Sequence, residues 1–387
     1  MTSLRYPGPR PFEYDDKELF FGREKDSERL LTLIKVEKLV VLFSKSGMGK
    51  SSLLNARIIP ALENLKYECI TTRFTNYVKK DKNASLISTD FSPTEKLRFH
   101  VKEKFVFTPT YLDSLWGIKK QKSLWHELKN IQITSKEKRI IFLFFDQFEE
   151  LFTYPSEEVQ IFSSHLAELL SPVIPQEYLD CIKRLQNEGK QALKEEDLEL
   201  LYDPIPIKVL IGIRSDKFSH LTQLKSTVSG IGNKTYELRS LTEEEAKEAI
   251  TKPASLEGDF SSNKFEFELE ACNKIITFLR ESENQVVEPF QLQILCSYLE
   301  NLVIKQREKS TIDKNEKELT LISSNDHLKN ISEIFERYYN DLVSSIDKKN
   351  ELRIKKFIEE GLIFEKDKIR LTLYKNQIKD DYGVDDN

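Results

Sequence analysis

The sequence from Leu39 to Ser52, LVVLFSKSGMGKSS, is the stretch that says most about the fold. A short apolar run, Leu39–Phe43, leads into a turn with two glycines, and the helical pattern SLLNARII follows. Gly47 and Gly49 let successive backbone N–H groups point inward at phosphate oxygens, and the start of the following helix adds its positive dipole end. The stretch therefore predicts a P-loop between a buried strand and a helix.

Each position of this loop has an expected role. The predicted nucleotide-binding residues are Ser46, Gly47, Met48, Gly49, Lys50, Ser51 and Ser52. Among them, Lys50 is expected to reach the β- and γ-phosphates, and the Ser51 hydroxyl to ligate Mg²⁺. Ser44 stands where the pattern GxxxxGK[ST] has its first glycine, and a serine would be strained by about 1 kcal/mol there if the position required a positive φ. The alternative interpretation is a glycine-rich turn that binds no ligand.

A second motif, IIFLFFDQFEELF, contains an apolar strand that ends at Asp146. This is the Walker B pattern, in which a carboxylate at the carboxyl end of a parallel strand lies beside the P-loop and holds Mg²⁺ through water. Glu149 and Glu150 follow within one turn, and either is a candidate base for the attacking water, with Glu150 preferred. Alternatively, both are solvated charges at a helix start, where acidic side chains favour the dipole.

Buried-type strands recur along the first 240 residues. Apolar runs are found at Leu39–Phe43, Cys69–Arg73, Ile140–Phe145 and Ile207–Ile213, with a weaker fifth candidate at Thr235–Leu238. Short apolar runs separated by helical stretches favour a parallel sheet with helices on both faces. The P-loop strand and the Walker B strand are expected not to be adjacent, with Cys69–Arg73 between them. The fourth run leads into Arg214, which is expected to sense the γ-phosphate or, alternatively, to form a salt bridge with an acid such as Asp216.

Two polar insertions interrupt this pattern. Residues of about 79–105 are expected to form a loop, and residues of about 183–203 a solvated helix. Beyond about residue 240 the strand pattern stops and amphipathic helices follow, the first of them after the capping-box pattern Thr242 to Glu245. The fold class is therefore an α/β domain followed by helices.

The composition excludes several classes of protein. The chain has 59 Lys and Arg against 64 Asp and Glu, a net charge of −5, so no basic field draws it onto nucleic acid or an anionic membrane. Its apolar runs fall far short of the roughly 20 residues that a membrane span needs. Its cysteines form no CxxC pair and its histidines no HExxH pattern. We expect a globular cytoplasmic protein that binds no membrane.

Several segments together resemble the STAND class of ATPases, in particular its novel bacterial members (nSTAND), which are relatives of NACHT and NB-ARC proteins. The resemblance is carried, in this order, by PGPRPF, FFGRE, SGMGKSSLLNARIIPAL, DQFEELF, LIGIRSD, LTEEEAKEAITKPA, VEPFQLQILCSYLE and FERYYNDL. It spans about residues 7–375. It implies an AAA+-like P-loop domain, a helical lid and a winged-helix domain, with ADP/ATP exchange that switches a closed monomer to an open oligomer.

The resemblance also implies a domain plan. Residues 1–22 would be a nucleotide-contact segment, 23–240 the P-loop ATPase domain, 241–340 the helical lid and 341–387 the start of a partial winged-helix domain. Gly22 and Arg23 would contact the adenine or the ribose, and Pro289 would pack on the adenine. From the residues alone, Arg23 is an ordinary first-turn charge and Pro289 the first residue of a helix.

The predicted function is a regulated ATP-hydrolysing switch in bacterial signalling or antiphage defence. Its ligands would be ATP/ADP and Mg²⁺, its ATP-bound form a homo-oligomer, and its trigger and effector would lie outside this chain. One alternative is a scaffold clamped by ADP with negligible turnover. Another is a winged-helix DNA-dependent AAA+ ATPase, against which the acidic charge balance argues.

The C-terminal sequence DDYGVDDN has the composition of a helix start, and no helix follows it. A winged-helix domain that begins near residue 341 should continue for some tens of residues. We therefore expect the chain to be a fragment of a longer protein.

Overall fold

The computed structural model of the chain describes residues 3–75, 91–116, 123–135, 139–188, 194–282, 286–312, 320–346, 351–361, 363–364 and 369–370. The chain forms two compact units. One is Arg10–Ala249, here named the α/β unit, and the other combines Met1–Pro9 with Ile250–Asn387 and is named the helical unit. None of the described helices has the length and apolar character that crossing a bilayer requires.

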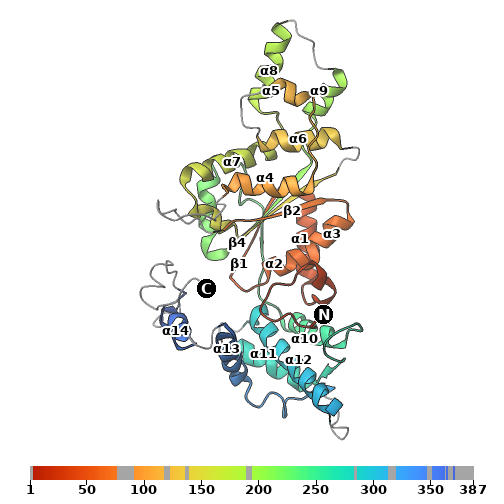
Figure 1. Cartoon of the computed structure of the whole chain (residues 1–387), viewed down its shortest axis with the longest axis vertical. Helices are drawn as coiled ribbons and strands as arrows, with labels where there is room; N and C mark the ends of the chain where they lie inside the picture. The colour runs from red at the N-terminus through yellow and green to blue at the C-terminus, as the bar shows by residue number, and fades with distance from the viewer. Residues whose placement is uncertain are drawn as a thin grey trace. The chain divides into compact units, whose positions relative to one another are not determined.

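A five-stranded parallel sheet forms the centre of the α/β unit (Figure 1). Its strands are β1 (Leu39–Ser44), β2 (Glu68–Arg73), β3 (Ile141–Asp146), β4 (Ile207–Arg214) and β5 (Thr235–Glu237). They lie in the order β2-β3-β4-β1-β5, and each neighbouring pair is parallel. The carboxyl ends of β1, β3 and β4 therefore meet at one edge of the sheet, which is where ligands bind in open parallel sheets.

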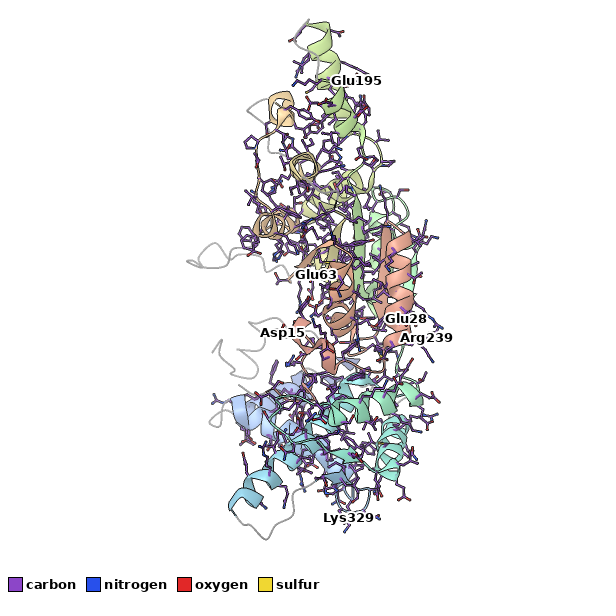
Figure 2. The ribbon with its side chains drawn as sticks, turned by 90° about the vertical axis from the view of Figure 1, so that its right-hand side faces the viewer. Asp15, Glu28, Glu63, Glu195, Arg239 and Lys329 are labelled. Atoms are coloured by element: carbon purple, nitrogen blue, oxygen red, sulfur yellow. The ribbon has the colours of Figure 1, made fainter. Side chains whose placement is uncertain are left out.

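Helices cover both faces of this sheet. The helices of the α/β unit are η1 (Tyr14–Leu19), α1 (Glu24–Val36), α2 (Lys50–Leu53), η2 (Leu54–Ile58), α3 (Ile59–Asn64), α4 (Pro93–Lys104), α5 (Tyr111–Trp116), α6 (Leu124–Thr134), η3 (Phe148–Thr153), α7 (Ser156–Leu170), α8 (Gln176–Asn187), α9 (Glu195–Tyr202), η4 (Ser215–Leu224) and α10 (Glu243–Ser255), which continues into the helical unit. Helices α1 and α3 lie on one face, α4 and α7 on the other, and α5, α8 and α9 lie beyond α6 (Figure 1). Exposed charged side chains, such as Glu28 on α1 and Glu195 on α9, point outward (Figure 2).

The core explains why the strands read as continuous apolar runs. Strand β3 is buried at every position, because helices cover it on both sides. On one face, Phe145 stacks on Phe74 with ring centroids 5.8 Å apart and meets Phe162 of α7 edge-on at 5.5 Å. On the other face, α1 buries Leu30 and Ile34. Each such side chain contributes about 1.5–3 kcal/mol when fully buried, so the two helix layers are fixed on the sheet.

The structure confirms the parallel α/β sheet with helices on both faces, and all five predicted strands are present. Strands β1 and β3 are not adjacent, as expected. The prediction that Cys69–Arg73 lies between them is wrong, because β4 separates them and β2 lies at the sheet edge. The segment 79–105, predicted to be a loop, contains helix α4, which begins after a capping box formed by Ser92 and Glu95. Residues 76–90 lie outside the described part of the chain.

The helical unit follows the α/β unit, as predicted. Its elements are α11 (Leu269–Ser282), α12 (Pro289–Ile312), α13 (Ile331–Ile346), α14 (Glu351–Lys356), η5 (Phe357–Gly361), the parallel pair β6 (Glu266–Phe267) and β7 (Leu321–Ile322), and the antiparallel pair β8 (Ile363–Phe364) and β9 (Ile369–Arg370). The division at residue 340 into a lid and a winged-helix domain stays a prediction. The C-terminal sequence DDYGVDDN lies outside the described residues.

The first residues of the chain also belong to the helical unit. Arg5 is 2% exposed, and its guanidinium donates to the carbonyl oxygens of Pro253 at 3.0 Å and Leu256 at 2.8 Å. The backbone N–H groups of Arg5 and Tyr6 donate to the carboxylate of Glu300 on α12 at 2.9 and 3.0 Å. Buried charges are costly unless they are paired and hydrogen-bonded. These bonds explain how both Arg5 and Glu300 can be buried.

Candidate nucleotide site

The P-loop joins the carboxyl end of β1 to α2. Gly47 and Gly49 have φ angles of 80° and 88°, in the left-handed region that glycine adopts without strain. Gly49 is the N-cap of α2, and its carbonyl accepts a helical hydrogen bond from the N–H of Leu53 at 2.9 Å. The helical run continues through η2 and α3. The loop therefore has the strand–loop–helix setting of a phosphate-binding cradle.

Ser44, at the first P-loop position, is the last residue of β1 and is buried. Among the described non-glycine residues, only Lys66 and Gln147 have a positive φ, so the serine carries no left-handed strain. Its hydroxyl accepts a hydrogen bond from Lys50 Nζ at 3.0 Å and donates to the Lys45 carbonyl at 2.9 Å. The departure from the glycine pattern therefore adds a partner for Lys50 instead of strain.

Lys50 lies near acidic side chains at the carboxyl edge of the sheet. Burial lowers the pKa of its ammonium group, and the negative charges of Glu149 and Asp146 oppose that shift. Its ammonium group also donates to the Ser44 carbonyl at 3.3 Å. A partly buried cation beside the P-loop glycines is suited to bind phosphate, because charge-assisted hydrogen bonds are about twice as strong as neutral ones.

The two motifs meet at one hydrogen bond. The Ser51 hydroxyl of α2 donates to Asp146 Oδ2 at the end of β3, at 2.9 Å. Asp146 Oδ1 accepts from the N–H of Gln147 at 3.0 Å, and Gln147 adopts a left-handed φ of 50°. A hydroxyl and a carboxylate are hard oxygen donors of the kind that Mg²⁺ takes. The two residues predicted to hold Mg²⁺ are therefore neighbours in space.

The two glutamates lie in the first turn of η3. Glu149 Oε2 accepts a hydrogen bond from the backbone N–H of Arg214 at 3.2 Å, which ties it to the carboxyl end of β4. Burial raises the pKa of Glu150, and the charge of Glu149 adds to the shift. Of the two, Glu149 is the one whose charge acts on the pKa of Lys50. Glu149 is therefore the glutamate more closely associated with the P-loop.

Arg214 forms a bidentate pair with Asp216. Arg214 Nε and Nη2 donate to the two carboxylate oxygens of Asp216, each at 3.0 Å. The side chains are 37% and 53% exposed, so this surface pair adds little stability. It is the salt bridge that the sequence allowed as the alternative to γ-phosphate sensing. The sensing role stays a prediction, and the main chain of Arg214 contacts the site through Glu149.

Gly22 and Arg23 lie in the α/β unit, next to the start of α1. Gly22 has a φ of 81°, and a Cβ atom there would lie 2.3 Å from the Glu245 carbonyl oxygen. Arg23 is 4% exposed and donates to the Met48 carbonyl at 3.1 Å and to Asp26 at 2.7 Å. Arg23 is thus no ordinary exposed first-turn charge. The predicted contact of Gly22 and Arg23 with the adenine or ribose stays a prediction.

The other predicted residues are placed as follows. Ser46 is exposed in the P-loop, and the Ser52 hydroxyl accepts a hydrogen bond from the N–H of Phe12 at 3.2 Å. Pro289 is the first residue of α12 in the helical unit, which is the position that the residues alone predict. Its contact with adenine stays a prediction.

Sequence reasoning missed three residues near the site. Arg73 Nε donates to Gln147 Oε1 at 2.7 Å, and Tyr236 and Asp26 form a hydrogen bond of 2.6 Å behind Arg23. Arg73 ends a predicted parallel strand, so its place at the carboxyl edge could have been found. Asp26 and Tyr236 belong to no motif, and nothing in the sequence pattern marks them.

Comparisons with solved structures give distant matches. A Walker-type ATPase of Pyrococcus abyssi is 15% identical at a TM-score of 0.41, over 87% of this chain and 82% of that one. The ORC2 protein of Aeropyrum pernix in its ADP form is 11% identical at a TM-score of 0.39, over 78% and 66%. Cdc6p from Pyrobaculum aerophilum is 10% identical at a TM-score of 0.33, over 76% and 64%. Likenesses this distant carry no argument about function. No curated protein matches the chain in sequence.

The family comparison is more informative. The model of the family described as Novel STAND NTPase 1 matches residues 6–285. This range is more than half of the chain and contains the P-loop, Asp146 with the two glutamates, and Arg214. The chain therefore belongs to the Novel STAND NTPase 1 family and is a nucleotide-binding NTPase.

Proposed function

We propose that the chain is a regulated molecular switch that hydrolyses ATP slowly to ADP and phosphate. The observation that carries the proposal is the 2.9 Å hydrogen bond between Ser51 Oγ and Asp146 Oδ2, which joins the P-loop to the Walker B strand. Family membership supports the nucleotide-binding part. A role in bacterial signalling or antiphage defence, and a change from an ADP-bound monomer to an ATP-bound homo-oligomer, complete the proposal.

The P-loop would hold the phosphates. Its backbone from Ser46 to Ser52 would supply N–H groups, and Lys50 would pair with the β- and γ-phosphates. The ammonium group of Lys50 is buried enough for its pKa to fall, yet two carboxylates oppose that fall. A phosphate would add further negative charge and keep the lysine protonated.

Ser51 and Asp146 are the residues that would hold Mg²⁺. Their oxygens fit this ion, because Mg²⁺ is bound in nucleotide sites by one or two such protein oxygens together with phosphates and waters. When bound, Mg²⁺ would neutralise charge on the phosphates. The chain itself contributes the orientation of Asp146, whose second oxygen is fixed by the N–H of Gln147.

We further propose Glu149 as the base that takes the proton of the attacking water, in preference to Glu150. The support is the hydrogen bond from the Arg214 amide, which holds Glu149 at the edge of the sheet, and the effect of Glu149 on Lys50. A base must lie within hydrogen-bond reach of the water that attacks the γ-phosphate. Glu150 would affect hydrolysis only indirectly, through the repulsion between its carboxylate and that of Glu149.

The helical unit would supply the switch. In this proposal, residues 241–340 form a lid that closes on the nucleotide, Pro289 packs on the adenine, and residues 341–387 begin a winged-helix domain. Exchange of ADP for ATP would change the preferred arrangement, and a trigger and an effector outside this chain would complete the pathway. The support for this plan is the resemblance of the segments VEPFQLQILCSYLE and FERYYNDL to STAND ATPases, because the family match itself ends at residue 285.

The first test is nucleotide binding by isothermal calorimetry. Lys50→Ala should weaken MgATP binding by about 100-fold or more, because it removes the charge-assisted bonds to two phosphates. The matched control is Lys35→Ala, an exposed lysine in the last turn of α1, which should bind like the parent chain. If Lys50→Ala binds MgATP like the parent chain, the P-loop is not the nucleotide site.

The second test is single-turnover phosphate release with Glu149→Gln and Glu150→Gln as a matched pair. Glu149→Gln should slow release by about 100-fold or more at unchanged MgATP affinity, as expected for loss of a general base. Glu150→Gln should slow it less. The opposite ranking would exchange the two roles. Release by the parent chain no faster than by Lys50→Ala would favour a nucleotide-clamped scaffold instead.

A further inference from the structure

The tip of the P-loop is held from outside by one arginine. Arg23, the N-cap of α1, donates from Nη2 to the carbonyl oxygen of Met48 at 3.1 Å. Both residues are 4% exposed, so water does not compete for this bond, and its electrostatic strength is high. The bond therefore fixes the direction in which the Met48 carbonyl points.

Fixing that carbonyl also fixes an N–H group of the loop. In a trans peptide, the C=O of one residue and the N–H of the next point to opposite sides of one plane, and no described peptide bond is cis. The Met48 carbonyl points to Arg23, so the Gly49 N–H points away from Arg23. Gly49 is the N-cap of α2, and its N–H is one of the loop amides expected to bind phosphate.

Arg23 is itself held in place by two further side chains. Its Nη1 donates to Asp26 Oδ2 at 2.7 Å, and the Tyr236 hydroxyl donates to Asp26 Oδ1 at 2.6 Å. Tyr236 lies on β5, where the register pairs it with Leu42 of the P-loop strand β1. A chain of hydrogen bonds thus runs from the sheet to the loop tip. The carboxylate of Asp26 also balances the charge of Arg23, which offsets the cost of burying it.

We propose that Arg23 is a positioning residue of the phosphate site, which orients the Gly49 N–H through the Met48–Gly49 peptide bond and is supported by Asp26 and Tyr236. Its effect falls on the polyphosphate, whatever nucleoside is attached. This role differs from a direct contact with adenine or ribose. The inference rests on the proposed function, because it requires a P-loop that binds phosphate.

The test compares MgATP with magnesium tripolyphosphate, which has no nucleoside, by calorimetry on the full chain. Arg23→Ala should weaken the binding of both probes by the same factor, about tenfold for a buried charged hydrogen bond. Arg23→Lys can reach only one of the two acceptors and should fall between the parent chain and Arg23→Ala. Tyr236→Phe removes the bond farthest from the loop and should weaken both probes by about threefold. The control, Lys35→Ala, removes an exposed cation in the last turn of the same helix and should change neither affinity.

Equal losses for the two probes support the inference. A loss confined to MgATP would place Arg23 on the nucleoside and overturn it, as would Lys50-dependent binding of MgATP without any binding of tripolyphosphate. Unchanged affinities in Arg23→Ala would overturn it as well. If Arg23→Ala does not fold, the same comparison is made with Tyr236→Phe. If Lys50→Ala binds both probes like the parent chain, the proposed function fails instead, so the two failures are distinguishable.

Discussion

Two buried arginines near the N-terminus serve the two units of the chain in different ways. Arg5 lies in the helical unit and Arg23 in the α/β unit, at 2% and 4% exposed. Each donates from its guanidinium to backbone carbonyl oxygens. The acceptors of Arg5, Pro253 and Leu256, lie at the end of α10 and just after it, and the Pro253 carbonyl also accepts from the Leu256 N–H at 3.3 Å. The acceptor of Arg23 is Met48, within the P-loop.

The difference shows that the same kind of interaction, a buried arginine that donates to a backbone carbonyl, can serve either stability or ligand binding. Arg5 donates to carbonyl groups that take no part in the proposed phosphate site. Its loss should therefore lower the free energy of unfolding. Arg23 fixes a peptide plane whose other side would face a ligand, so its loss should appear in binding. Measurements that separate the stability of each unit from ligand affinity therefore test whether the two arginines differ in this way.

The largest effect is expected for Arg5→Ala. This change leaves the buried carboxylate of Glu300 without a balancing charge and removes the side-chain donor of the Leu256 carbonyl, at a cost of about 3–5 kcal/mol. The measurement is urea unfolding, followed in parallel by far-ultraviolet circular dichroism and tryptophan fluorescence. Both tryptophans, Trp116 and Trp125, belong to the α/β unit. The dichroism should therefore show an early loss of helix, while the fluorescence transition keeps its midpoint.

The control for Arg5→Ala is Arg10→Ala in the α/β unit. Arg10 pairs with Asp16, but its side chain is 51% exposed, so the loss should be about 1 kcal/mol or less. If Arg5→Ala lowers the fluorescence midpoint as much as the dichroism midpoint, the two units unfold together. The assignment of Arg5 to the stability of the helical unit, in contrast to Arg23, would then be wrong.

A smaller effect is expected for Gly22→Ala, which disturbs the backbone next to Arg23. The left-handed backbone costs about 1–2 kcal/mol in any residue other than glycine. The added Cβ would also lie 2.3 Å from the Glu245 carbonyl oxygen, so the backbone must shift. Tryptophan-monitored unfolding should show the loss of stability, and MgATP affinity should fall with it.

Gly230→Ala is the matched control for Gly22→Ala. Gly230 has a similar φ of 78°, but the atom nearest to its new Cβ, Nδ2 of Asn233, would be 3.7 Å away. Gly230→Ala should lose stability only through the cost of the left-handed backbone, and it should bind MgATP like the parent chain. Equal affinities for the two alanine variants would contradict the idea that the Gly22 contact supports the P-loop.

The smallest effect is expected from pH, where two buried carboxyls should respond with opposite signs. Burial raises the pKa of Glu300 despite opposing hydrogen bonds from Arg5 and Tyr6. The folded helical unit then binds a proton more readily than the unfolded chain. Its free energy of unfolding should therefore rise as the pH falls through the raised folded pKa, and level off below the unfolded value.

Asp16 should show the reverse. Burial would raise its pKa, but the hydrogen bond from Arg10 and the N–H of Glu13 outweigh this, and the pKa is lowered. Its stabilising contribution to the α/β unit is present above the unfolded carboxyl pKa and is lost as the pH falls through the folded pKa. Each effect is measured as the difference in the free energy of unfolding between the parent chain and a variant, Glu300→Gln for the first and Asp16→Asn for the second. A difference of the same sign for both would refute the assignment.

Sequence patterns predict the sheet and the two motifs because both depend on local chemistry. Strand β3 is apolar throughout because it is buried on both faces, and the glycines of the P-loop are needed for their left-handed backbone. The position of β4 between β1 and β3 could not be fixed in this way, because an apolar run encodes burial and not its neighbour. Helix α4 had a signal, the capping box of Ser92 and Glu95, within a segment that looks polar.

The finer parts of the site depend on contacts between distant segments. Glu149 and Glu150 are equivalent by spacing, and the Arg214 amide distinguishes them. The burial of Arg23 depends on Asp26 in the same helix and on Tyr236 in a weak edge strand. Neither residue type nor spacing encodes such partners. The sequence therefore places Arg23 near the nucleotide only through the family resemblance, and it leaves the mode of action open.

The bonds of Arg5 also set an order for folding during synthesis. The acceptor of its backbone N–H, the carboxylate of Glu300, lies 295 residues further along the chain. The N-terminal peptide leaves the ribosome first, but its partners are made only after the whole α/β unit, and domains generally fold as units while the chain grows. The α/β unit can therefore complete its sheet while that peptide waits unpaired. A nascent chain arrested before α12 should carry a protease-resistant α/β unit with a cleavable N-terminal tail, and release of the finished chain should protect that tail.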